Sequence, residues 1–182
     1  MPTAVYLHFA CHGVYNIEES LASHLQLSGQ QTFSLSELMF GKAQPLQARL
    51  VVLSACKTGI IDFHKVPDEL IGFPAGFLQA GVPGIISTLW AVDDISTALL
   101  MIRFYQYHLK ENLEPSQALQ QAQSWLRNAT GKQLRDFGNQ FFQKAAKKEP
   151  YVYQTMRHFK AIPDKKPFAH PYYWAGFVFS GV

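Results

Sequence analysis

Cysteine and long apolar runs are both scarce in this sequence, and each shortage excludes a class of protein. Only two of the 182 residues are cysteine, too few to build a disulfide scaffold in a chain of this length. No run approaches the roughly 18 consecutive apolar residues that a membrane-spanning helix needs. Pro2 and Thr3 after Met1 do not begin a secretory signal either. We therefore expect a cytoplasmic protein that has no membrane association.

Two further absences concern ligands. No Cys/His grouping has zinc-site spacing, and no glycine-rich phosphate loop follows the first apolar run. The sequence thus predicts neither a metal nor a cofactor, and a flavodoxin-like small-ligand binder is the weakest interpretation. The formal net charge is +3, and the 16 Lys and Arg are scattered apart from short pairs, so we expect no nucleic-acid partner.

The apolar content is large, and its pattern predicts a parallel α/β sheet. With 48% hydrophobic residues, the chain can bury the core of a single domain over residues 1–182. Three short apolar runs, at 4–11, 49–55 and 84–90, are typical of buried parallel strands. The segments between and after them have helical spacing. These comprise a helix that ends near Gly81, a long helix after Asp93 and Asp94, helices between 115 and 161, and then a last strand at 173–179.

Short-range signals divide the polar segment between the first two runs. Residues 28–31 are typical of a small hairpin turn. Ser34 and Glu37 match a capping box that opens a short helix.

The candidate catalytic residues follow the first two predicted strands. His12 and Gly13 come after the first run, and Cys56 comes after the second. The carboxyl ends of parallel strands form the edge where reacting groups gather, and a neighbouring imidazole is the usual base for a cysteine thiol. The order and spacing of His12 and Cys56 approximate the caspase arrangement, so we assign Cys56 as nucleophile and His12 as general base. The N–H groups of Gly13 and Cys56 would form the oxyanion hole.

Each of these residues also has a simpler structural interpretation. A lone cysteine at a strand end is usually a small buried hydrophobe, and a lone His-Gly is usually a turn. Their joint occurrence on neighbouring strands favours catalysis. Cys11 alternates with His12 and should point into the core, and a disulfide between Cys11 and Cys56 is not expected in a reducing compartment.

With these residues in place, the sequence resembles the CHAT domains. These are caspase-like cysteine peptidase domains of clan CD, related to separases, common in cyanobacteria and often attached to tetratricopeptide repeats. The resemblance rests on segments that span nearly the whole chain: HFACHG at 8–13, LSACKTG at 53–59, FLQAG at 77–81, STLWAVDD at 87–94 and HPYYWAGF at 170–177.

The resemblance implies a three-layer caspase-like sandwich that hydrolyses peptide bonds in protein substrates without a metal. It also implies that Asp94, with Asp93 beside it, binds a basic side chain of the substrate. A carboxylate just before a helix is equally a standard N-cap. We weigh the two roles evenly, and one aspartate could perform each.

The sequence departs from the family at its start, where the strands that usually precede the histidine strand are missing. We expect that this strand would form an exposed edge, which self-association or an upstream repeat domain would cover. The alternative function is therefore a catalytically silent, caspase-like scaffold or signalling module that works with a tetratricopeptide-repeat partner.

Overall fold

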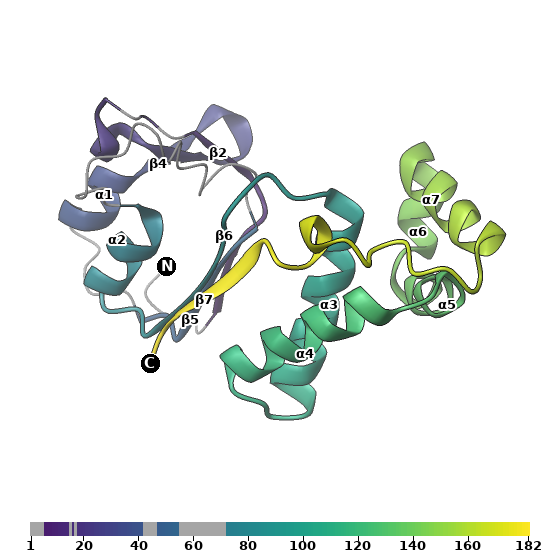
Figure 1. Cartoon of the computed structure of the whole chain (residues 1–182). Coiled ribbons are helices and arrows are strands. Elements are labelled where there is room, and N and C mark those ends of the chain that lie inside the picture. The colour runs from purple at the N-terminus through teal and green to yellow at the C-terminus, as the bar shows by residue number, and fades with distance from the viewer. Residues whose placement is uncertain (1–5, 15, 17, 42–46, 55–71) are drawn as a thin grey trace. The chain divides into compact units, whose positions relative to one another are not determined.

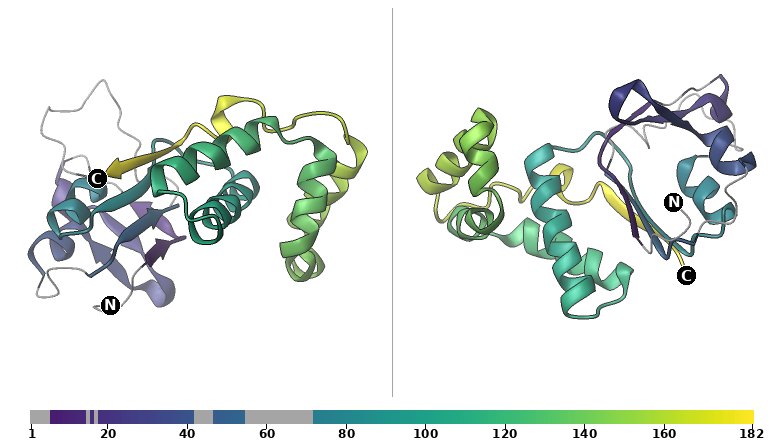
Figure 2. Two further views of the ribbon diagram at one scale, coloured as in Figure 1. Left: turned by 90° about the horizontal axis from the view of Figure 1, so that it is seen from below. Right: turned by 180° about the vertical axis from the view of Figure 1, so that it is seen from behind.

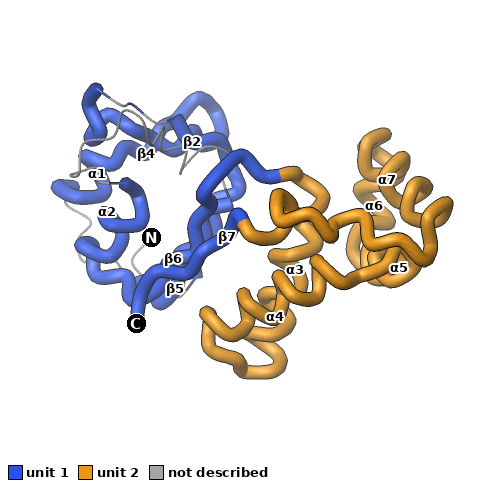
Figure 3. The backbone as a smooth tube through the Cα atoms, viewed as in Figure 1, with its two compact units in different colours: residues 1–92, 176–182 blue, residues 93–175 orange. Residues whose placement is uncertain are grey.

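The protein is mixed α/β, with 54% of the described residues in helices and 18% in strands. Its structure is a computed structural model that describes residues 6–14, 16, 18–41, 47–54 and 72–182. Contacts between residues divide the chain into two compact units, residues 1–92 with 176–182 and residues 93–175 (Figure 3). The prediction of one domain over the whole chain stays a prediction.

The first unit contains the predicted sheet. Its four strands lie in the order β1-β5-β6-β7, and the last three are labelled in Figure 1. They are β1 (Tyr6–Phe9), β5 (Leu50–Leu53), β6 (Gly84–Thr88) and β7 (Phe177–Gly181). The first three are parallel, and β7 is antiparallel to β6. The prediction of a mostly parallel sheet flanked by helices, consistent with a caspase-like sandwich, is confirmed.

Alternation along the strands explains which face of this sheet builds the core. Val51 and Leu53 of β5 and Ile85 of β6 pack with buried side chains of α1 (Leu35–Phe40) and α2 (Phe73–Gln79). The two views in Figure 2 show both helices on the same side of the sheet. One face of the sheet is therefore covered from within this unit.

Local capping signals hold these two helices at their predicted ends. The Ser34 side chain accepts a hydrogen bond from the Glu37 N–H, and Glu37 accepts one from the Ser34 N–H, so the capping box is confirmed. Gly81 follows α2 with a φ of 88°. Its N–H donates to Leu78 O, and the Val82 N–H donates to Phe77 O, which is the Schellman arrangement.

A small second sheet follows β1. It consists of β2 (His12–Val14), β3 (His24–Gln26) and β4 (Thr32–Ser34), which pair antiparallel in that order. Two 3-10 turns lie beside them, η1 (Ser20–Ala22) and η2 (Ser28–Gln30). The second of these connects β3 to β4, which confirms the hairpin predicted at 28–31.

The second unit is entirely helical apart from its connections. It contains α3 (Asp94–Lys110), α4 (Pro115–Asn128), α5 (Gly131–Phe141), α6 (Gln143–Lys148), α7 (Pro150–Ala161) and the 3-10 turn η3 (Pro171–Tyr173). Buried apolar residues of α3 and α4 pack together. The Arg103 guanidinium lies 4.7 Å from the Trp125 ring centre and 4.8 Å from that of Phe137, which ties α3 to α4 and α5.

The end of the chain corrects one prediction. The last strand covers residues 177–181 rather than 173–179, because Pro171 begins a 3-10 turn and its carbonyl accepts the Ala175 N–H at 2.8 Å. Within the described part of the chain, none of the helices combines the length and apolar character needed to cross a membrane.

Candidate active site

The candidate site begins where β1 and β5 end side by side. Phe9 is the register partner of Leu53, and the Ser54 N–H donates to the Phe9 carbonyl at 3.1 Å. Cys56 is two positions beyond Ser54 and lies outside the described residues. The predicted adjacency of the two strands is confirmed, and with it the common rim at their carboxyl ends.

His12 emerges three positions beyond Phe9. It is the first residue of β2, where it pairs with Gln26, and its side chain is exposed to solvent. Gly13 follows in the same strand and is buried. The sequence pattern suggested a turn as the simpler role for this dipeptide, whereas the structure places both residues in a short strand. The exposed imidazole is accessible for proton transfer.

A hydrogen bond joins β1 to the segment after β5 just before this rim. His8 Nε2 and Ser54 Oγ lie 2.8 Å apart, and the same Oγ lies 3.5 Å from the Phe9 carbonyl oxygen. Desolvation by surrounding atoms lowers the pKa of His8, although the residue keeps solvent-exposed surface. The neutral imidazole is therefore favoured at this position, next to the segments that lead to His12 and Cys56.

The two predicted substrate-binding aspartates occupy different environments. Asp93 is the N-cap of α3, and its Oδ1 accepts the Ser96 N–H at 2.8 Å. Its Oδ2 accepts the Tyr151 hydroxyl at 3.1 Å. Burial and then the Asp93 charge raise the pKa of Tyr151, so this hydroxyl keeps its proton. Asp94 is the first residue of the helix and its side chain is exposed. The structure thus gives the capping role to Asp93.

Nearly the whole chain matches a known protein family. A family model described as the CHAT domain matches residues 2–182. The chain belongs to the CHAT domain family. This family is related to cysteine peptidases of the caspase type. No curated protein matches the chain.

The second cysteine of this CHAT domain has a structural role. Cys11 is half-buried and packs against the core formed by the sheet, α1 and α2. Its predicted orientation into the core is thus confirmed. Burial raises the pKa of the Cys11 thiol, which reduces the thiolate fraction near neutral pH and hence its reactivity. Cys11 therefore serves as an internal control for thiol chemistry at Cys56.

Nothing among the described residues of the CHAT domain indicates a metal centre. Within those ranges, no three His, Cys, Asp or Glu side chains lie close enough together to hold an ion.

Sequence reasoning missed the His8–Ser54 pair as part of the site. Both residues lie inside motifs that carried the family resemblance, HFACHG and LSACKTG. The available signal was a histidine that alternates with buried residues along a β-strand. Successive side chains of a strand point to opposite faces, so such a histidine marks a polar side chain on one face. Only the register of β1 on β5 shows that Ser54 is its partner.

Proposed function

We propose that this CHAT domain is a cysteine endopeptidase of caspase or separase type that cleaves protein substrates, with Cys56 as nucleophile and His12 as general base. The observation that carries the proposal is the parallel pairing of Phe9 with Leu53. His12 and Cys56 each follow their paired residue by three positions. Three residues of extended chain span at most about 11 Å, so chain length alone keeps both reacting groups within that distance of the paired strand ends.

The proposed reaction proceeds by acyl transfer through the sulfur. His12 takes the Cys56 thiol proton, and the thiolate attacks the peptide carbonyl carbon. The N–H groups of Gly13 and Cys56 stabilise the oxyanion. The C–N bond then breaks, and the leaving amine takes the proton from the His12 imidazolium. A water deprotonated by His12 finally attacks the thioester, which releases the acid and returns the proton to the thiol.

Substrate selectivity is assigned to Asp94 in this proposal. Its exposed carboxylate lies in the family motif STLWAVDD, at the position that implies recognition of a basic side chain. Asp93 is already engaged by the Ser96 N–H and the Tyr151 hydroxyl. The exposed carboxylate is therefore the better candidate for an arginine or lysine of the substrate.

A thiol-directed peptidyl electrophile with arginine next to the reactive carbonyl tests the proposal. Mass spectrometry should locate the label on Cys56, and Cys56→Ala should abolish it. His12→Ala should slow labelling by about 10²-fold or more, as loss of a general base does. Cys11→Ala is the matched control and should label at the unchanged rate. Asp94→Asn should reduce the preference for arginine over norleucine in the same probe series.

The contrary result is equally specific. Labelling of Cys11 and Cys56 at similar rates, indifferent to His12, would overturn the peptidase proposal. The domain would then be the silent scaffold module considered from the sequence, and its partner would be sought among tetratricopeptide-repeat proteins.

A further inference from the structure

Positive charge is concentrated in one part of the chain that the proposed peptidase chemistry does not use, which corrects the scattered distribution expected from the sequence. Residues 131–166 contain nine Lys and Arg and three Asp and Glu, a formal charge of +6. The remaining residues contain seven Lys and Arg and ten Asp and Glu, a formal charge of −3. The basic segment comprises α5, α6, α7 and the connection that follows them. A partner that this region attracts must therefore be acidic.

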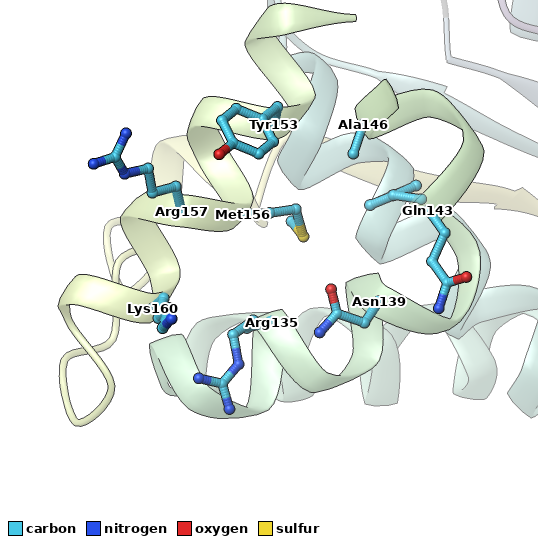
Figure 4. A pocket seen from close by; sticks show the side chains of 9 residues that line it. Arg135, Asn139, Gln143, Ala146, Tyr153, Met156, Arg157 and Lys160 are labelled. Carbon is cyan, nitrogen blue, oxygen red and sulfur yellow. The ribbon is translucent and has the colours of Figure 1, made fainter. Parts of the chain in front are cut away.

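A pocket lies among these three helices. Its volume is about 410 Å³, within the range of about 300 to 1,000 Å³ that is typical of ligand sites. The lining residues come from α5, α6 and α7 and from the junction between α5 and α6. They are Arg135, Asn139, Phe142, Gln143, Ala146, Tyr153, Met156, Arg157 and Lys160 (Figure 4). None of these nine residues is acidic.

Three of the lining residues, contributed by two helices, are cations. Figure 4 shows Arg135 on one helix, with Arg157 and Lys160 on the helix opposite. Arg157 and Lys160 are exposed. Arg135 forms an ion pair with Asp136 at 2.7 Å, and 52% of the Asp136 side chain is exposed. An ion pair of this exposure contributes little to stability, so an anionic ligand can compete for the guanidinium. Glu149 is the N-cap of α7 and does not line the pocket.

The interior of the pocket is apolar. Met156 is half-buried and points its sulfur into the space between the helices, with Ala146 across from it, and Phe142 also lines the pocket. A Cβ at Gly138 of α5 would lie 2.8 Å from the Met156 sulfur, so the glycine allows α5 and α7 to approach closely. Methionine adapts to side chains of different shape, and the pocket can therefore accept an aliphatic group.

We propose that this pocket binds an acidic polypeptide segment in which an aliphatic side chain, flanked by carboxylates, enters the Met156 pocket while the carboxylates meet Arg135, Arg157 and Lys160. The Asn139 and Gln143 amides supply hydrogen bonds to the peptide backbone. A nucleic acid fits less well, because single strands need several rings for base stacking, and of the two aromatic lining residues, Phe142 and Tyr153, only Tyr153 is exposed. The proposal goes beyond the peptidase function and does not depend on it.

Fluorescence anisotropy of the full chain with a labelled peptide tests this directly. The probe has about twelve residues, with a Glu-Leu-Glu-Glu core between Gly and Ser flanks. Binding should be saturable, and it should be lost when the leucine is replaced by serine or the glutamates by glutamines. Arg157→Glu combined with Lys160→Glu should weaken binding by about tenfold or more.

The matched control changes the same charge outside the pocket. Lys147 and Lys148 lie in the last turn of α6 and are not among the lining residues, so Lys147→Glu combined with Lys148→Glu should weaken binding by about threefold or less. Circular dichroism establishes that both variants remain folded. The Cys56→Ala variant should bind as the wild type does, so failure of the peptidase proposal leaves this one intact.

Three results would overturn the proposal. One is an absence of saturable peptide binding, and another is equal loss of binding in the two double variants, which would indicate unspecific charge attraction. The third is tighter binding of a single-stranded oligonucleotide of equal charge, with the same dependence on Arg157 and Lys160. That outcome would make the region a nucleic-acid surface.

Discussion

Replacing Asp93 by alanine should destabilise the helical unit by about 1 to 2 kcal/mol. The change removes the acceptor of the Ser96 N–H bond at 2.8 Å, and loss of such an N-cap costs about 0.5 to 2 kcal/mol. It also removes the acceptor of the Tyr151 hydroxyl at 3.1 Å. Because Tyr151 is 54% exposed, that bond adds about 0.5 kcal/mol or less.

Two neighbouring substitutions separate capping from charge. Asp93→Asn keeps a side-chain oxygen that caps as well as aspartate does, so its free energy of unfolding should stay within about 0.5 kcal/mol of the wild type. Asp94→Ala removes an exposed carboxylate from the first turn of α3, where the helix dipole makes it worth about 0.3 kcal/mol. The wild type, Asp93→Asn and Asp94→Ala should therefore have similar free energies of unfolding, and the free energy of unfolding of Asp93→Ala should be well below theirs.

Urea unfolding followed by circular dichroism measures these differences, with the slope against urea used to establish that all four proteins expose similar surface. Equal losses for Asp93→Ala and Asp94→Ala would refute the reasoning, because the cap would then contribute nothing beyond charge. So would an Asp93→Asn protein as unstable as Asp93→Ala. In the peptidyl probe assay, by contrast, Asp94→Asn should lose the basic preference and Asp93→Asn should retain it.

Three further predictions concern single residues. The folded-state pKa of His8 lies below its ordinary value of about 6.5. The stability that the neutral His8 contributes is therefore fully present above about pH 6.5 and is lost as the pH falls through the folded-state pKa. His8→Gln should therefore lose less stability than the wild type between about pH 7.5 and about pH 5, as measured by thermal unfolding. Gly81→Ala should cost about 1 kcal/mol in urea unfolding because of its φ of 88°; an unchanged midpoint would contradict this. Arg103→Lys should lower stability by about 1 kcal/mol, since a lysine cannot stack on several rings as a guanidinium does, and Lys110→Arg on the same helix is the control.

Much of the sheet could be predicted because its strands are short runs of apolar residues that are buried. The runs at 49–55 and 84–90 became β5 and β6, whose residues are all buried. The end of α2 followed from Gly81, since only a residue that tolerates positive φ completes that hydrogen-bonding pattern. These features depend only on residues that are neighbours in sequence or on the burial of apolar residues. Both can be recognised in the amino-acid sequence.

Features that depend on tertiary pairing could not be predicted in the same way. The strand β2 has three residues, too few for any alternation to be recognised, and it exists because β3 pairs with it. The His8–Ser54 bond joins residues 46 positions apart, and only the register of two strands brings them together. The sequence left Asp93 and Asp94 equivalent as caps. The extended backbone of Asp93, with a ψ of 136°, decides between them.

The acidic-peptide pocket shows how a sum over the chain conceals local structure. A net charge of +3 is unremarkable for 182 residues, yet it combines a +6 segment with a −3 remainder. The α7 wall of the pocket is a stripe at helical spacing, residues 153, 156, 157 and 160, and the facing wall comes from α5, α6 and the junction between them, residues 135, 139, 142, 143 and 146. Alone, such a stripe of cations with methionine or phenylalanine suits neither a core nor an ordinary solvated face. Close packing at Gly138 brings the two walls of the pocket toward each other. The same residues then form a site that is apolar inside and basic at its opening. The double charge reversal in α7 is therefore a sharper test than any change in total charge.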